Sequence, residues 1–233
     1  MTKDPNTGAL GGLMVDYLEA LGKAAQLKIE WAQEVDIATY LQDLAAGRYD
    51  AECVGGWPNA ERAKLAAYTK PIAFYPLYAW VRNDDTRFDL NLSALNQPTV
   101  RIAVADGGTD AHILAAQFPA ATALRIPQLS GGVTDLVMQV TTKKADVIFT
   151  DLPSMAGFNR QNPDQLRPLL NHPVDMKKIT LSVAAREQQL LNFLNEVGDI
   201  LVLSGATEKV LQKYETISGS FLRPAPPYSM EKN

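Results

Sequence analysis

Two polar residues follow predicted β-strands at places where α/β proteins bind ligands. Residues 100–105 form an apolar strand pattern, and Asp106-Gly107-Gly108-Thr109 leads from it into a helix over residues 110–117. Free backbone amides and the helix dipole at such a turn favour an anion. Thr109 would add a hydroxyl and an N–H group, and Gly108 would let the backbone approach closely. The alternative is a tight turn with a helix cap.

Asp151 directly follows a second buried strand pattern, over residues 146–149. It should lie at the carboxyl edge of a sheet, where α/β ligands bind, and could bind an ammonium group. The alternative is an N-cap for the following helix. Arg62 could bind a carboxylate through two parallel hydrogen bonds, as any guanidinium can, but from the residue pattern alone it is more simply a solvated helix arginine.

The other reactive residue types exclude several function classes. Cys53 is the single cysteine and His112 and His172 are the two histidines, so we expect no disulfide, thiolate cluster or His-rich metal site. No Ser/His/Asp arrangement marks a nucleophile, and Gly107-Gly108 lacks the third glycine of a dinucleotide fingerprint. A net charge of −4 gives no general reason to expect nucleic acid or an anionic membrane. We therefore expect no cofactor and no metal.

The elements that would position these residues alternate between strands and helices. Strand patterns cover residues 27–31, 49–54, 73–81, 100–105, 123–126, 146–149 and 179–184. Apolar spacing predicts helices over residues 13–27, 37–46, 60–67, 110–117, 132–142, 188–203 and 207–214, with another starting at Thr150-Asp151. This alternation predicts an α/β fold with largely parallel sheets. The apolar runs are shorter than the ~20 residues that cross a bilayer.

A set of short motifs, in order along the chain, resembles the amino-acid-binding solute receptors of ABC transporters, extracellular solute-binding family 3. The set spans residues 7–214, most of the chain. Its members are Thr7-Gly8, Gly12, Asp16, Leu44, Gly47-Arg48-Tyr49-Asp50, Glu61-Arg62, Pro71, Gly107-Gly108-Thr109, Asp146, Asp151, Ser204-Gly205 and Lys213-Tyr214.

The resemblance implies a Venus-flytrap fold, in which two α/β lobes are joined by a two-stranded hinge and hold ligand between them. Lobe one would comprise residues 1–82 and 180–233, and lobe two the inserted residues 83–179. Arg62, with Thr109 and Gly108, would bind the ligand carboxylate, and Asp151 the ligand ammonium. A zwitterion could then bridge the lobes and stabilise closure, because a ligand shifts an equilibrium through its differential affinity for the two states.

Several positions depart from the family pattern. Trp57 and Asn59 stand where hydroxyl side chains are common, although the backbone carbonyl of Gly55 could still meet the ligand amine. Trp57 would wall the pocket, or pack at a lobe surface. Gly108 stands where the family usually has a hydroxyl residue, so we expect one contact to be missing. Ile37 takes the place of an aromatic clamp found in some relatives.

The proline-rich tail is the second departure. The family normally opens with a strand inside the first sheet, followed by a Pro-Pro-aromatic turn, and this chain starts just after that point. Residues 221–229, Phe-Leu-Arg-Pro-Ala-Pro-Pro-Tyr-Ser, are close to that opening sequence. One hypothesis is a circular permutant, in which the tail supplies the strand and Tyr228 covers the ligand. The other is an N-terminally trimmed protein whose tail packs elsewhere.

The resemblance implies a monomeric binding protein that captures an L-amino acid and delivers it to a membrane ABC permease. Such a protein would be periplasmic or extracytoplasmic, and the polar residues 1–8 show no secretory signal. Two alternatives share the fold. One is the sensor domain of a signalling receptor. The other is a dehydratase acting on cyclohexadienyl acids, with Asp151 or Glu61 as proton donor.

Overall fold

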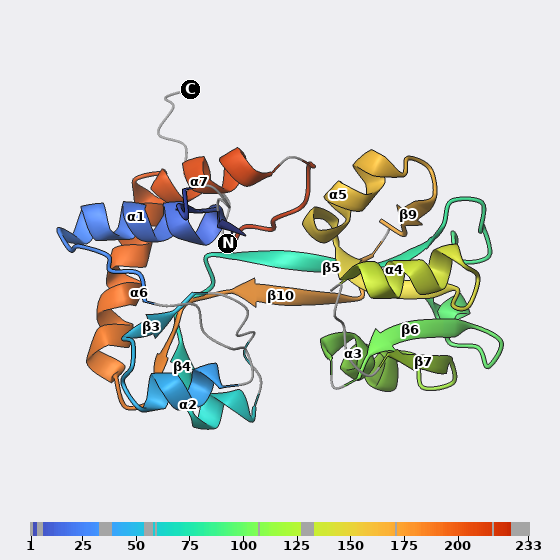
Figure 1. Cartoon of the computed structure of the whole chain (residues 1–233), viewed down its shortest axis with the longest axis horizontal. Helices are drawn as coiled ribbons and strands as arrows, with labels where there is room; N and C mark the ends of the chain where they lie inside the picture. Colours follow the sequence, from blue (N-terminus) through green and yellow to red (C-terminus); the bar gives the residue numbers. More distant parts are fainter. Residues whose placement is uncertain are drawn as a thin grey trace. The chain divides into compact units, whose positions relative to one another are not determined.

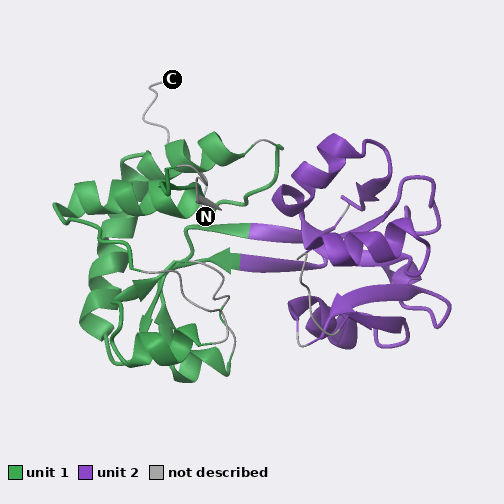
Figure 2. Cartoon of the chain, viewed as in Figure 1, with its two compact units in different colours: residues 1–74, 178–233 green, residues 75–177 purple. Residues whose placement is uncertain are grey.

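The computed structural model of the chain describes residues 2–3, 7–32, 39–53, 58, 60–106, 108–126, 133–170, 172–215 and 217–224. The chain divides into two compact units, unit 1 of residues 1–74 and 178–233 and unit 2 of residues 75–177 (Figure 2). Both changes of unit fall inside strands, β5 (Ala73–Arg82) and β10 (Asp175–Ile179). The lobe boundaries predicted from the sequence, 82/83 and 179/180, lie eight and two residues later.

Unit 1 contains a three-stranded sheet in the order β3 (Ala51–Glu52), β11 (Ser182–Ala184), β4 (Ala66–Tyr68). The central β11 runs antiparallel to both neighbours and places Ser182 opposite both Glu52 and Tyr68. Helix α2 (Tyr40–Ala45) contacts all three strands. A short ladder between β1 (Thr2–Lys3) and β2 (Leu10–Gly11) precedes them.

Three helices of unit 1 pack against one another: α1 (Leu13–Ala25), α6 (Gln188–Leu203) and α7 (Ala206–Tyr214) (Figure 1). Buried residues of α1 recur four apart, at Leu13, Tyr17 and Leu21, so one stripe of the helix faces the other two. Gly22 lets the following chain approach, because a Cβ there would lie 2.9 Å from both the Leu27 carbonyl oxygen and Ile29 Cγ1.

Unit 2 is a three-layer α/β structure. Its sheet has the order β10-β5-β8-β6-β7, with β9 (Leu166–Pro168) also pairing with β5. Strands β6 (Arg101–Ala105), β7 (Thr122–Ile126) and β8 (Val147–Asp151) are parallel, whereas β5 is antiparallel to β8. A turn of 3-10 helix, η2 (Leu92–Leu95), precedes β6.

The alternation of side chains along β6 assigns one helix layer to each face of the unit 2 sheet (Figure 1). Ile102 and Val104 pack with buried residues of α3 (Thr109–Gln117). Ala103, between them, packs with buried residues of α4 (Val133–Thr141) and α5 (Leu152–Gln161). The carboxyl ends of β6 and β8, which run side by side, therefore lie at one edge of a covered sheet.

Three predictions about elements are wrong. The sheet of unit 1 is antiparallel, because β11 follows unit 2 in sequence and enters between β3 and β4 in the opposite direction. The helix predicted over residues 60–67 is reduced to the 3-10 turn η1 (Arg62–Lys64), since Ala66 already pairs with β11. Residues 27–31 form no strand: within the described residues no segment pairs with them, and Leu27 stays 51% exposed.

The described part of the tail does not supply a strand to the unit 1 sheet. Leu222 instead forms an antiparallel bridge with Phe74 of β5, and both backbone hydrogen bonds are 2.8–2.9 Å long. Arg223 of this segment forms ion pairs with Glu208 of α7 at 2.9 Å and with Glu215 at 2.7 Å. Residues 221–224 therefore do not take the place expected for the opening strand. Tyr228 lies outside the described residues.

Candidate functional site

Asp151 lies at the carboxyl end of β8 and caps helix α5. Its two carboxylate oxygens accept hydrogen bonds from the Ser154 backbone N–H at 2.8 Å and the Ser154 hydroxyl at 2.9 Å. The side chain thus performs the capping role considered from the sequence, in a residue that is 9% exposed. Burial, and secondarily the charge of Asp151, raises the pKa of Tyr75 to about 12, so this phenol lies near the carboxylate.

Thr109 is the first residue of α3, and Gly108 is its N-cap with φ −75° and ψ 165°. Any residue type can adopt these angles, so space and not backbone conformation makes glycine necessary. A Cβ at position 108 would lie 2.2 Å from Asp110 Oδ1 and 3.1 Å from the Ala105 carbonyl oxygen. The Asp110 carboxylate therefore occupies the place that a side chain at 108 would take.

Asp110 is a residue of this edge that the sequence analysis missed. Its buried carboxylate accepts a hydrogen bond of 2.6 Å from the Ala105 backbone N–H. Burial raises the pKa of Asp110, although the backbone N–H groups that bind the carboxylate lower it. The charge of Lys177 on β10 also lowers it. An aspartate in the first turn after Gly-Gly-Thr could have suggested this contact, since acidic residues favour helix N-termini.

The edge of the unit 2 sheet brings Thr109 and Asp151 onto neighbouring elements. Ile102 of β6 is paired in parallel with Val147 of β8, so the two strands end side by side. Thr109 starts the helix after β6, and Asp151 starts the helix after β8. This edge can therefore present a hydroxyl, helix-terminal amides and carboxylates to a small molecule.

Arg62 belongs to unit 1 and opens the short turn η1. Its guanidinium carbon lies 5.9 Å from the centre of the Tyr40 ring. The hydroxyls of Tyr40 and Tyr68 are both buried, and within the described residues neither has a hydrogen-bond partner. Burial raises the pKa of Tyr68, as does the neighbouring Tyr40, whereas the charge of Arg62 lowers it, so the guanidinium lies near both phenols. Neither tyrosine was identified from the sequence.

The remaining predicted site residues lie outside the described residues: Gly55, Trp57, Asn59 and Tyr228. The described candidates fall in different units, Arg62 in unit 1 and Thr109, Gly108 and Asp151 in unit 2. That the two groups share one cleft stays a prediction.

Two other residues of the family pattern serve the structure of their own unit. Asp16 accepts hydrogen bonds from the Lys213 ammonium at 2.5 Å and the Tyr214 hydroxyl at 2.9 Å, which joins α1 to α7. The Lys213 hydrogen bond lowers the pKa of Asp16. Asp146 precedes β8, at the end opposite Asp151, and forms ion pairs with Arg82 and Arg87 at 3.2 and 2.8 Å.

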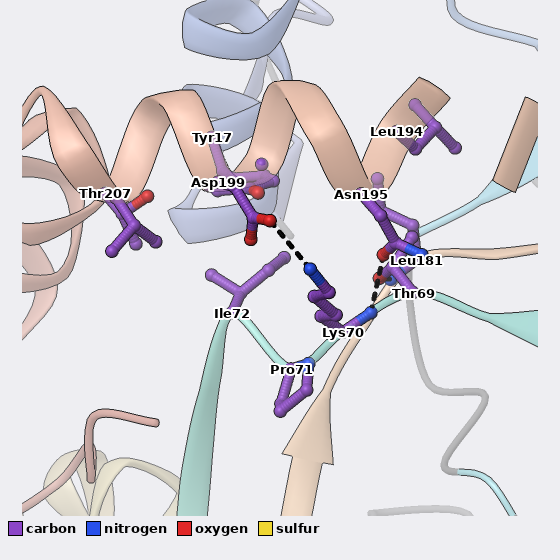
Figure 3. Close-up of a pocket in the computed structure, with 12 residues that line it drawn as sticks. Tyr17, Thr69, Lys70, Pro71, Ile72, Leu181, Leu194, Asn195, Asp199 and Thr207 are labelled. Atoms are coloured by element: carbon purple, nitrogen blue, oxygen red, sulfur yellow. Dashed lines mark hydrogen bonds and ion pairs between the residues drawn. The ribbon is translucent and has the colours of Figure 1, made fainter. Parts of the chain in front are cut away.

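A small pocket of about 30 Å³ in unit 1 lies apart from these candidates (Figure 3). It is bordered by an ion pair of 2.7 Å between Lys70 and Asp199, and by the hydrogen bond of 2.8 Å from the Lys70 backbone N–H to Asn195. Arg62 does not line it. Its volume is of the order that one or two water molecules require.

The described part of the chain contains neither a metal-ligand cluster nor a membrane-spanning helix. No group of three or more His, Cys, Asp or Glu side chains is arranged there to hold a metal ion. None of the helices there combines the length and the apolar character needed to span a bilayer.

Burial raises the pKa of the Cys53 thiol to about 11, which disfavours the nucleophilic thiolate form at neutral pH.

A family model described as bacterial extracellular solute-binding proteins, family 3, matches residues 1–216. A comparison with curated proteins found no match. Among solved structures, a putative binding component of an ABC transporter from Wolinella succinogenes, complexed with lysine, is 17% identical. Its TM-score is 0.77, and the match covers 93% of this chain and 91% of that chain.

Two ancestral proteins are also similar in structure. One is an ancestral amino acid-binding protein described as a precursor of cyclohexadienyl dehydratase, with 22% identity, a TM-score of 0.71 and coverage of 91% of this chain and 88% of that chain. The other is an ancestral arginine-binding protein bound to arginine, with 19% identity, a TM-score of 0.69 and coverage of 91% of each chain. These likenesses confirm the predicted α/β fold of periplasmic-binding-protein type. With the family model matching nearly its whole length, the chain belongs to the bacterial extracellular solute-binding proteins of family 3.

Proposed function

We propose that this solute-binding protein binds a free L-amino acid and delivers it to a membrane ABC permease from the periplasmic or extracytoplasmic side. The proposal rests on the presence of two charged groups that complement the two charged groups of an amino acid. Arg62 in unit 1 can bind a carboxylate, and Asp151 at the sheet edge of unit 2 can bind an ammonium group. Two similar structures contain a bound amino acid, arginine in one and lysine in the other.

In this proposal the ligand joins the two units. Its carboxylate would meet Arg62 and the amide and hydroxyl of Thr109, and its ammonium would meet Asp151. Asp151 accepts two hydrogen bonds from Ser154, and two carboxylate oxygens offer about four lone-pair sites, so acceptor capacity remains for an ammonium group. Gly55, Trp57, Asn59 and Tyr228 stay predicted contacts of the same ligand.

Calorimetric titration of the purified chain with the common L-amino acids tests the proposal. We expect at least one to bind, and Arg62→Ala to abolish that binding. Arg48→Ala is the matched control, since Arg48 lies in the same unit, carries the same charge and is 71% exposed in its ion pair with Asp43. Unchanged binding in Arg62→Ala, or equal losses in both variants, would refute the role of Arg62. Failure of every amino acid to bind would refute the proposed ligand class.

An enzyme is the second candidate, favoured by one observation in unit 2. Asp110 is a buried carboxyl group whose pKa is raised by burial, at the same edge as Asp151, and a raised pKa suits a proton donor. One similar structure is described as a precursor of cyclohexadienyl dehydratase. Incubation of the chain with prephenate and with arogenate decides between the candidates: turnover that is lost in Asp110→Asn would favour the enzyme.

A further inference from the structure

The Arg62 side chain begins in a turn too short to restrict it. η1 contains only three residues, and Arg62 is its first. An arginine side chain has several rotatable bonds, and holding its planar guanidinium in one orientation costs conformational entropy unless neighbouring groups restrict it beforehand. The part of the site that recognises a carboxylate therefore depends on contacts made by other elements of unit 1.

Tyr40 provides one such contact from helix α2. Its ring faces the guanidinium at 5.9 Å, within the range of a cation–π interaction. The ring itself has little freedom, because Tyr40 is only 3% exposed and α2 packs on all three strands of the sheet. The Tyr49 hydroxyl also donates a hydrogen bond of 2.6 Å to the Tyr40 carbonyl oxygen, which fixes the start of the helix.

The sheet beneath α2 supports the same arrangement. Glu52, Ser182 and Tyr68 stand directly opposite one another across β3, β11 and β4, so their side chains share one face. The Ser182 hydroxyl donates to Glu52 at 3.0 Å in a buried position. Tyr68 is the third residue of this row. Its pKa is raised by burial and by Tyr40 and lowered by the charge of Arg62, so Tyr68 lies close to both residues. Tyr40 therefore lies near both the polar row of the sheet and the guanidinium.

We infer that Tyr40 is a positioning residue for Arg62: its buried ring holds the guanidinium in the orientation that receives a ligand carboxylate. This inference rests on the proposed function, because it assigns Tyr40 a role in binding through Arg62. The contribution comes from the ring face, and the Tyr40 hydroxyl, which has no hydrogen-bond partner among the described residues, is not required. Removing the ring should therefore weaken binding, whereas removing only the hydroxyl should not.

Binding of L-arginine, L-lysine and L-glutamine to the full chain is measured by calorimetry in the wild type and in three variants. Tyr40→Leu should weaken binding about 2- to 30-fold, the range of a cation–π contact, and Tyr40→Phe should restore the lost affinity. Tyr17→Leu is the control for a general loss of packing, since Tyr17 is a buried tyrosine of α1 in the same unit.

A second measurement needs no ligand. Urea unfolding of the wild type, Tyr40→Leu, Arg62→Ala and the double variant should be non-additive by about 2- to 5-fold in the unfolding equilibrium constant. Additive effects would overturn the inference, whether or not any of the three amino acids binds. So would unchanged affinity in Tyr40→Leu, or a Tyr40→Phe variant as weak as Tyr40→Leu. If Arg62→Ala binds normally while the unfolding cycle is non-additive, the contact exists but the proposed function of Arg62 fails.

Discussion

Replacing Asp151 by asparagine should separate its two roles, because asparagine caps a helix as well as aspartate but carries no charge. The Asn Oδ1 atom can accept the Ser154 N–H that Asp151 accepts at 2.8 Å. Its amide nitrogen can donate to the Ser154 hydroxyl, reversing the direction of the present bond of 2.9 Å. Both contacts of the cap are kept, so the free energy of unfolding should change by only a few tenths of a kcal/mol.

Asp151→Ala removes the same cap entirely. The loss of an N-cap side chain lowers stability by about 1 kcal/mol, within a range of about 0.5–2 kcal/mol. The two variants should therefore differ clearly in urea unfolding. They should agree in calorimetry, since a hydrogen bond to a charged group contributes about 1.5–3 kcal/mol and both variants lack the carboxylate. We expect an affinity loss of about 10- to 150-fold for any amino acid that the wild type binds.

The control for this pair is Asp106→Asn. Asp106 follows β6 at the same edge, is 54% exposed and pairs with Arg125 at 3.1 Å, so its replacement changes the charge of the edge without changing a cap. Its affinity should match the wild type. Wild-type affinity in Asp151→Asn would refute the ammonium role, and a loss of stability equal to that of Asp151→Ala would refute the capping argument.

Three further predictions concern stability. Tyr68→Phe should raise the melting temperature, because it removes a buried hydroxyl that has no hydrogen-bond partner in the described part of the chain. Gly157→Ala should stabilise α5 by about 0.4–1 kcal/mol in urea unfolding, because no described residue lies within 4 Å of the added Cβ, whereas Gly22→Ala should destabilise the chain. A hydrogen bond from Arg87 lowers the pKa of Asp85, so this carboxylate contributes stability near neutral pH that is lost as the pH falls below about 4. The free energy of unfolding of Asp85→Asn should therefore decrease less steeply at acid pH than that of the wild type.

Much of unit 2 could be predicted from the sequence because its strands are short apolar runs followed directly by turns. The patterns over residues 100–105, 123–126 and 146–149 correspond to β6, β7 and β8 within two residues at either end. A parallel sheet covered on both faces produces such continuous apolar runs, and its carboxyl edge follows from strand direction alone. Asp151 and Thr109 could be placed at that edge for this reason.

Unit 1 was harder to predict because its elements depend on residues distant in sequence. Ala66–Tyr68 becomes a strand only through pairing with β11, which lies more than a hundred residues later. Residues 27–31 have the alternation of a strand, but pairing is what makes a strand. Tyr40 and Asp110 were missed for a related reason, because helix and strand spacing does not reveal contacts between elements. Tyr40 contacts an arginine on another element, and Asp110 accepts a hydrogen bond from a backbone amide of the preceding strand.

A crystal structure of the chain with a bound amino acid, chosen by the calorimetric screen, would show whether Arg62 and Asp151 bind the two charged groups of one ligand. We expect the ligand carboxylate to be bound by the Arg62 guanidinium together with Thr109, and its ammonium group to lie within hydrogen-bond distance of the Asp151 carboxylate. An amino acid bound with its two charged groups on other side chains, or with Arg62 and Asp151 in no common cavity, would contradict this expectation.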